Sequence, residues 1–293
     1  MKKINPKLIL FLGVLGISIS AILVRMSEAP SLVLATYRMM WSVLLLIPFS
    51  LKKTLPELKM IRKKEAAVSI LAGILFALHF TLWFESLKHT TIACSTVLVD
   101  TDVIFAAIGY CLLMKGSIPK KGAAAILITV CGSILTALSG GASADVSLYG
   151  NILALIAAVL IAGFTLSGKY IRNHGISTSA FTLIAYPVCL ITLLILDFVS
   201  GTPIVGYEIK ELFIGLGMAV FCTLLGHSIL NWTLKYLSPG YVSAVKLCEP
   251  IFATVLGILL FKEIPSAIQV IGAFIIIFGI YIYSTVENTE QTQ

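Results

Sequence analysis

Long apolar runs separated by short polar segments follow one another along almost the whole chain. Each run has about 20 residues, which is enough for a helix to cross a hydrocarbon core about 30 Å thick. The runs lack the alternation of a barrel strand, and helices satisfy their own backbone hydrogen bonds in lipid, so we expect helices. The pattern predicts an all-α membrane protein with ten transmembrane helices, at residues 8–24, 31–51, 66–87, 92–114, 122–139, 148–169, 178–199, 212–234, 241–261 and 265–285.

The composition agrees with this pattern, because 58% of the 293 residues are hydrophobic and only 12% are charged. Soluble domains carry about 25% charged residues, so composition also indicates an integral membrane protein. The six cysteines and four histidines show no metal-ligand spacing, and the chain has no glycine-rich phosphate loop. We therefore expect no metal, no cofactor and no ATP-driven transport within this chain.

The Lys and Arg residues are distributed unevenly between the two sides of the predicted helices. With the N-terminus in the cytoplasm, fifteen of them fall in inner segments, and the outer loops hold only Arg25, Lys88, Lys210 and Lys262. Cytoplasmic loops carry such an excess of cations, so we predict a multi-pass protein of the cell membrane with both termini in the cytoplasm. The net charge of +7 therefore reports orientation and does not indicate a nucleic-acid partner.

The two halves of the chain align at an offset near 147 residues, which places Gly132 on Gly279. An odd number of helices per repeat forces opposite orientations, and the cation-rich segment 52–64 matches an outer loop with a single Lys. We predict two inverted five-helix repeats, at 1–142 and 146–287, and a short cytoplasmic tail at 288–293. Such repeats suit alternating access around a midplane site, although an old duplication kept as a scaffold would give the same pattern.

Several motifs resemble those of EamA-type proteins of the drug/metabolite transporter superfamily. They are His79 to Phe84, Ser95 to Val99, Phe105, Gly226-His227, Asn231-Trp232, Tyr236 to Pro239, Glu249 to Phe252 and Lys262-Glu263. The resemblance covers nearly the whole chain and implies a ten-helix exporter fold with a central cavity for a small molecule. The first half departs from the family pattern, with Val103 in place of a proline, Gly116 in place of an acidic residue, and Asp100 and Asp102 in place of neutral residues.

Ionisable side chains in the middle of the predicted helices are costly in lipid and therefore mark candidate functional sites. Asp100 and Asp102 lie near the middle of helix 92–114. They are about 200° apart around its axis, so only one of them can face a central cavity. The alignment of the halves favours Asp102, because it falls on Glu249. Pro250 follows Glu249 directly, and we expect it to kink the helix beside that carboxylate.

Two basic side chains lie at comparable depth. Arg38, beside Tyr37 in helix 31–51, has five fixed donors that suit an anionic group or one of the carboxylates, and an interhelical ion pair is the structural alternative. Lys246 lies one turn before Glu249 on the same face. Two interpretations remain open: a Lys246–Glu249 pair that neutralises itself within the bundle, or a substrate or proton site.

Two further pairs of side chains are candidates for the cavity lining. His79 and Trp83, and likewise His227 and Asn231, are four residues apart and so share a helix face. The structural alternatives are a histidine bonded to a backbone carbonyl and a tryptophan at the membrane interface.

Together these features predict a secondary transporter, and not an enzyme, that exports a small polar metabolite by alternating access. Amino acids, nucleobases and drug-like compounds fit such a site, and buried acidic groups are compatible with proton coupling. Membrane lipid and protons are the expected further partners, and the protein would be a monomer or a homodimer. A lipid flippase or an accessory subunit of one is the main alternative. An intramembrane enzyme is disfavoured, because no nucleophile or metal set accompanies the carboxylates.

Overall fold

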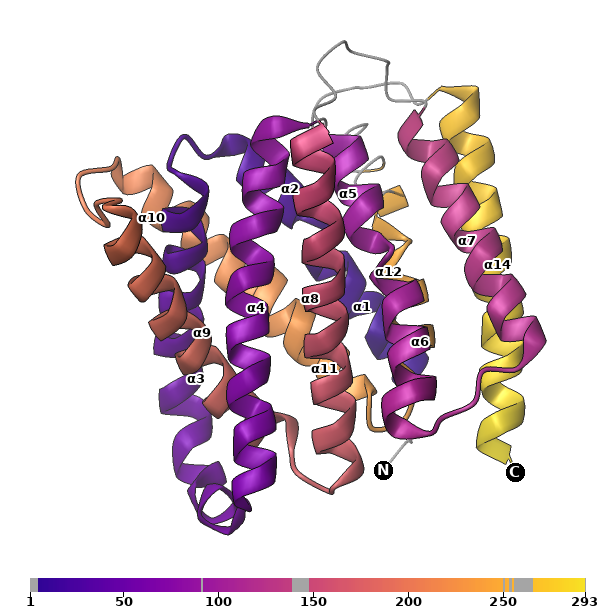
Figure 1. Cartoon of the computed structure of the whole chain (residues 1–293), viewed down its shortest axis with the longest axis horizontal. Coiled ribbons are helices and arrows are strands. Elements are labelled where there is room, and N and C mark those ends of the chain that lie inside the picture. The colour runs from indigo at the N-terminus through magenta and orange to yellow at the C-terminus, as the bar shows by residue number, and fades with distance from the viewer. Residues whose placement is uncertain are drawn as a thin grey trace.

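A computed structural model describes residues 5–90, 92–138, 148–249, 251–252, 255 and 266–292. Within these residues the chain forms helices and no strand, and most helices run in the same general direction across one bundle (Figure 1). The helices are α1 (Pro6–Ser18), α2 (Ser20–Met26), α3 (Ser31–Met60), α4 (Lys63–His89), α5 (Ile92–Asp100), α6 (Asp102–Met114), α7 (Lys120–Leu138), α8 (Leu148–Asn173), α9 (Thr178–Ser200), α10 (Ile209–Gly217), the π-helix η1 (Met218–His227), α11 (Ser228–Thr233), α12 (Pro239–Lys246) and α14 (Ala267–Thr292).

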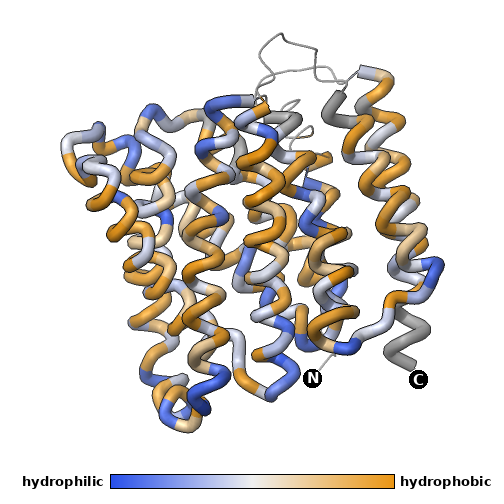
Figure 2. The backbone as a smooth tube through the Cα atoms, viewed as in Figure 1, coloured by the Kyte–Doolittle hydropathy of each residue, from blue (hydrophilic) through white to orange (hydrophobic). Residues whose placement is uncertain are grey.

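Seven of the predicted spans correspond to helical segments that are long and apolar enough to cross a membrane. These segments are Pro6–Val24, Ser31–Met60, Lys63–His89, Ser95–Met114, Leu148–Asn173, Thr178–Ser200 and Ile209–Thr233. Hydrophobic residues dominate the helices, and hydrophilic residues gather at the turns between them (Figure 2). The predicted span 122–139 coincides with α7, and α14 contains a shorter apolar stretch, Val270–Val286. Of the predicted span 241–261, residues 250, 253–254 and 256–261 lie outside the described residues.

Helix boundaries follow local capping chemistry. α9 begins after Ser177, whose side chain accepts a hydrogen bond from the N–H of Ala180. It ends at Gly201, which has a φ of 68° and so takes the left-handed conformation that glycine adopts without strain. α12 begins in the same way, with Ser238 as N-cap and Pro239 at the first helical position.

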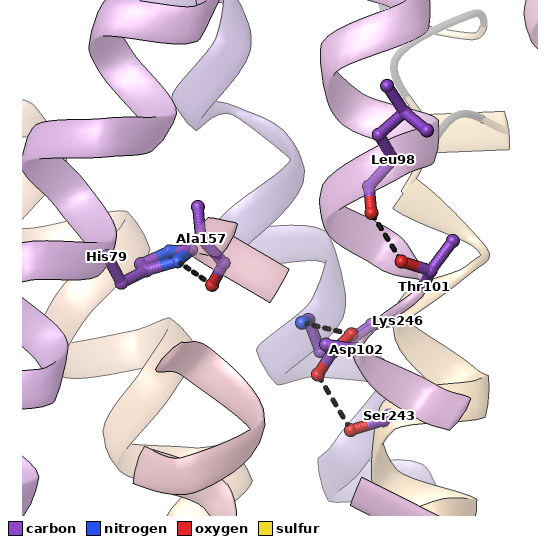
Figure 3. A network of polar contacts seen from close by, with 7 residues as sticks. All are labelled: His79, Leu98, Thr101, Asp102, Ala157, Ser243 and Lys246. Atoms are coloured by element: carbon purple, nitrogen blue, oxygen red, sulfur yellow. Dashed lines mark hydrogen bonds and ion pairs between the residues drawn. The ribbon is translucent and has the colours of Figure 1, made fainter. Parts of the chain in front are cut away.

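Three predicted spans are divided into shorter helices. The break that matters most for the site is at Thr101, between α5 and α6. The Thr101 hydroxyl donates to the carbonyl of Leu98 at 2.6 Å, and this side-chain bond competes with regular helical bonding (Figure 3). Asp100 therefore ends one helix and Asp102 begins the next.

The buried apolar residues form two clusters. One joins α3, α4, α8, α9 and η1, and in it the rings of Phe76 and Phe164 stack with centroids 4.2 Å apart. The other joins α1, α6, α7, α11, α12 and α14, and in it Tyr241 meets Tyr283 edge-on. α7 and α14 lie side by side at one edge of the bundle (Figure 1).

Glycine at position 132 permits the close approach of α7 and α14. A Cβ on Gly132 would lie 2.8 Å from the backbone N of Ile276 and 2.9 Å from the carbonyl O of Gly272. These atoms belong to the backbone of α14, so a larger side chain would push the two helices apart. Helices in lipid gain no hydrophobic driving force from contacting each other. Small residues stabilise such crossings because they permit close van der Waals packing of the two backbones.

We expect Gly132→Ala to destabilise the protein by about 1–3 kcal/mol, because overpacking here moves backbone. The matched control is Gly217→Ala, whose Cβ would meet nothing closer than Leu23 Cδ1 at 3.6 Å. Thermal unfolding of the purified protein in detergent measures both variants. Equal unfolding temperatures for the two variants would contradict this account of the α7–α14 contact.

Candidate functional site

A cavity of about 30 Å³ lies where the two apolar clusters meet, with walls from α1, α2, α3, α4, α5, α8, η1 and α12. Its lining residues are Ile17, Ser20, Arg38, His79, Trp83, Val99, Asp100, Ile161, His227, Lys246 and Glu249. The charged and aromatic members of this set are all at most 9% exposed. A volume of this size exceeds the roughly 10–15 Å³ that a cavity needs to hold one water molecule. Seven of the ten predicted site residues therefore meet around one small space, although they lie far apart in the sequence.

Arg38 of α3 is held in a fixed orientation. Its Nε donates to Thr223 Oγ1 at 2.9 Å, its Nη1 donates to Ser20 Oγ at 3.4 Å, and its guanidinium lies 4.2 Å from the ring centroid of Phe80. Its Nη2 is buried and has no hydrogen-bond partner among the described residues. Arg38 therefore presents a donor that its protein neighbours leave unused.

Among the described residues, Asp102 and Lys246 form an ion pair in which both side chains are buried. Lys246 Nζ lies 3.0 Å from Asp102 Oδ1, and Ser243 Oγ donates to Asp102 Oδ2 at 2.9 Å (Figure 3). This finding corrects the interpretation that Lys246 pairs with Glu249. The reason is that α12 packs against α6, so the aspartate on the neighbouring helix is closer to the ammonium than the glutamate one turn along.

Asp100, rather than Asp102, lines the cavity. The expectation that Asp102 faces the cavity rested on its alignment with Glu249, and in the structure both Asp102 carboxylate oxygens instead accept hydrogen bonds from Lys246 and Ser243 of α12. Asp100 Oδ2 is buried and has no hydrogen-bond partner among the described residues. Glu249 also lines the cavity. The kink expected at Pro250 falls on a residue outside the described part of the chain.

His79 and Trp83 of α4 lie together on the cavity wall. His79 Nδ1 is 3.0 Å from the carbonyl O of Ala157 (Figure 3). Because a carbonyl only accepts, Nδ1 carries a proton in this contact. The ring of Trp83 stacks on that of His79 with centroids 5.8 Å apart, and Trp83 Nε1 is buried without a partner among the described residues.

The remaining predicted residues have different positions. His227 of η1 lines the cavity and meets Phe76 edge-on, with ring centroids 4.9 Å apart. Asn231 donates to the carbonyl of His227 at 3.0 Å and lines a second, smaller cavity. Tyr37 is absent from both linings, and its hydroxyl donates to the carbonyl of Ile204 at 2.6 Å.

The second cavity, of about 10 Å³, shares Ile161, His227 and Lys246 with the central one. Its other lining residues are Phe164, Thr165, Leu230, Asn231, Leu234 and Val242. Most of these side chains are apolar, so this second cavity beside the charged centre is mainly hydrophobic.

The sequence interpretation missed Ser20, Thr223 and Ser243, which hold Arg38 and Asp102 in place. The signal for Thr223 is structural: it lies in a ten-residue π-helix, a rare element that is frequently found at functional sites. Among the described residues, no group of three His, Cys, Asp or Glu side chains is arranged to hold a metal ion.

Comparison with known proteins adds a family and a set of relatives. The EamA-like transporter family matches residues 6–138 and again residues 148–285. An uncharacterized transporter of Clostridium kluyveri is 27% identical over 250 residues, which cover 83% of this chain and 80% of the relative. The pseudopaline exporter CntI of Pseudomonas aeruginosa is 22% identical over 208 residues, 71% of each chain. A solved crystal structure of 16% identity matches 98% of both chains with a TM-score of 0.77, which shows a shared fold.

We expect Lys246→Met to destabilise the protein by about 3–5 kcal/mol, because it leaves the Asp102 charge buried and unpaired. The double variant Lys246→Met/Asp102→Leu should recover much of this loss, since both charges are then removed. The control is Lys88→Met, which breaks only the half-exposed Lys88–Glu85 pair, at 3.8 Å. Thermal unfolding in detergent measures all three variants. A double variant less stable than Lys246→Met would contradict the pairing.

Proposed function

The chain belongs to the EamA-like transporter family, and on this premise we propose that it is a secondary transporter that exports a small polar metabolite by alternating access. The observation that carries the proposal is the central cavity, where Arg38, Asp100 and Glu249 lie buried among apolar helices. Ionisable groups at such depth are expensive, and in membrane proteins they mark substrate and ion pathways.

Two inverted five-helix repeats, at 1–142 and 146–287, are part of this proposal. The family matches the chain twice, once in each half. The helix contacts are also symmetric: when each helix is replaced by the corresponding helix of the other half, the same pairs of helices are in contact. α3 packs on α9, α6 on α12 and α7 on α14, and the contact of α4 with α8 has a counterpart in the contact of η1 with α1. These observations support ten helices related by a pseudo-two-fold axis, and the excess of Lys and Arg in the inner segments supports cytoplasmic termini.

Alternating access requires contacts that close the pathway on each side and that can open in turn. At the proposed outer end, the carboxylate of Glu211 accepts from Ser27 Oγ and from the backbone N–H of Glu28. At the proposed inner end, Lys169 Nζ donates to the carbonyls of Leu234 and Leu237 at 2.9 and 3.0 Å. A cavity of about 30 Å³ between these ends is far too small for a metabolite, so one end must open for substrate to enter.

Export and proton coupling rest on two supporting observations. A relative is named as an exporter of pseudopaline. The charges around the cavity are the second observation. Lys246 compensates Asp102, and Arg38 then faces two carboxylates, Asp100 and Glu249. If all these groups are ionised, the site has one surplus negative charge, and a proton or a positive group on the substrate would compensate it.

Untargeted mass spectrometry of medium and cytosol tests the proposed function. Cells would express the wild type, Asp100→Asn, Glu249→Gln or the control Glu85→Gln at equal membrane levels. Glu85 is a suitable control, because its side chain is 39% exposed and pairs with Lys88 and His89 on the surface. We expect a metabolite that accumulates in the medium with the wild type and the control, and at least tenfold less with either cavity variant.

If expression of none of the four proteins changes the metabolites in the medium, export of a soluble metabolite is overturned. A change confined to membrane lipids would favour a lipid flippase or an accessory subunit instead. Loss of export in Glu85→Gln as well would show that the effect does not come from the cavity.

Lys169→Met should open the proposed inner end, because the methionine keeps the length of the side chain and removes its donors. The reporter is Thr165→Cys, which lines the second cavity, in a background with the native cysteines replaced by alanine. In inside-out vesicles, whose cytoplasmic side faces outward, we expect a membrane-impermeant maleimide to label this cysteine several times faster with Lys169→Met than without it. The control is Lys235→Met, since Lys235 is exposed at the same end. Equal labelling rates with and without Lys169→Met would contradict the role of Lys169.

A further inference from the structure

We propose that the central cavity binds a zwitterion, a small molecule with one carboxylate, one ammonium group and an apolar body. This inference rests on the proposed function, because the cavity must open to admit any such molecule. It goes further by naming the chemical class of the ligand and the side chain that binds each pole.

The carboxylate pole is assigned to Arg38 and Trp83. Arg38 Nη2 and Trp83 Nε1 are both buried, both belong to residues that line the cavity, and neither has a hydrogen-bond partner among the described residues. Guanidinium and indole groups donate hydrogen bonds and do not accept them. A ligand that satisfies them must therefore supply acceptors, and a carboxylate supplies two oxygens in the geometry that guanidinium binds best.

Three contacts on its other side hold the Arg38 guanidinium ready for this role. Thr223 and Ser20 use its Nε and Nη1, and the ring of Phe80 covers one face. These contacts fix the plane of the guanidinium without using Nη2. Such a group loses little side-chain freedom when it binds a ligand.

The ammonium pole is assigned to Asp100, with Glu249 beside it on the cavity wall. Asp100 Oδ2 is buried without a partner among the described residues. Asp102 is excluded from this role, because Lys246 and Ser243 already occupy both of its oxygens. An ionised carboxylate only accepts hydrogen bonds, and an ammonium group offers three donors.

A ligand with one pole would satisfy only part of the site. A simple anion would pair with Arg38 and leave two carboxylates without a counter-charge, and a simple cation would leave the Arg38 and Trp83 donors unused. A zwitterion satisfies donors and acceptors together, and a proton on one of the two carboxylates then compensates the surplus negative charge of the site. The apolar part of the wall is formed by Ile17, Val99 and Ile161, and the second cavity, which shares Ile161 with the first, is lined mainly by hydrophobic side chains. The body of the ligand is therefore apolar, as in an amino acid with a hydrocarbon side chain.

Two sets of matched compounds test this proposal on the purified protein. One set is L-leucine, 4-methylpentanoate and 3-methylbutylamine, and the other is L-phenylalanine, 3-phenylpropanoate and 2-phenylethylamine. Within each set, the second compound lacks the amine and the third lacks the carboxylate. Ligand-induced thermal stabilisation in detergent gives an apparent affinity for each compound. We expect the amino acid of at least one set to bind at least tenfold more tightly than both of its analogues.

Variants of the two poles assign each group of the ligand. Arg38→Gln should weaken the amino acid at least tenfold and leave the weak binding of the amine unchanged. Asp100→Asn should weaken the amino acid and leave the weak binding of the carboxylate analogue unchanged. Glu85→Gln on the surface is the matched control and should change nothing. This crossed pattern separates a loss of one contact from a general loss of folding, which would weaken all compounds alike.

The proposal is overturned if none of the six compounds binds, if an analogue with one pole binds as tightly as its amino acid, or if both variants weaken all three compounds equally. Counterflow of radiolabelled amino acid in proteoliposomes separates this proposal from the proposed function. Tight binding without counterflow would support the zwitterion site and contradict transport. Export of a metabolite that carries no opposite charges would support transport and overturn the zwitterion.

Discussion

The buried ion pair between Lys246 and Asp102 determines the chemistry of the centre of this protein. It joins α12 of the second half to α6 of the first half, and Ser243 occupies the remaining oxygen of the aspartate. Charges removed from water need such complete pairing, because neither lipid nor an apolar core solvates them. The pair consumes one carboxylate and one ammonium group. Arg38, Asp100 and Glu249 remain as the charged side chains of the cavity wall that are outside this pair.

Most of the helical architecture could be predicted from the sequence, because lipid imposes a simple rule on the chain. A backbone in hydrocarbon must bond to itself, so apolar runs of sufficient length become helices. The run 178–199 became α9, Thr178–Ser200, with boundaries that differ by one residue at the C-terminal end. The break at Thr101 and the π-helix η1 could not be predicted in this way, since they depend on side-chain bonds to carbonyls and on packing between helices.

The set of site residues was easier to predict than their pairing. Arg38, Asp100 and Glu249 were found because each is a charge inside an apolar run, and that signal needs no tertiary information. The partner of Lys246 and the identity of the carboxylate on the cavity wall required the contact between α6 and α12. Helical geometry along one chain could not supply that contact. Ser20 and Thr223 gave no signal, since hydroxyl residues are common throughout membrane helices.

The unpaired groups of the cavity also bear on how a carrier couples its substrate to its movement. Closing both ends around Arg38, Trp83 and Asp100 without a matching ligand leaves buried donors and acceptors unsatisfied, at about 1–3 kcal/mol for each group. Closing around a ligand that pairs with them removes this cost, whereas an end open to water hydrates them. The difference favours the closed form when it is loaded. A ligand shifts a conformational equilibrium only by such a difference in affinity between the two states. The same side chains would therefore select the substrate and allow the change between the two open states.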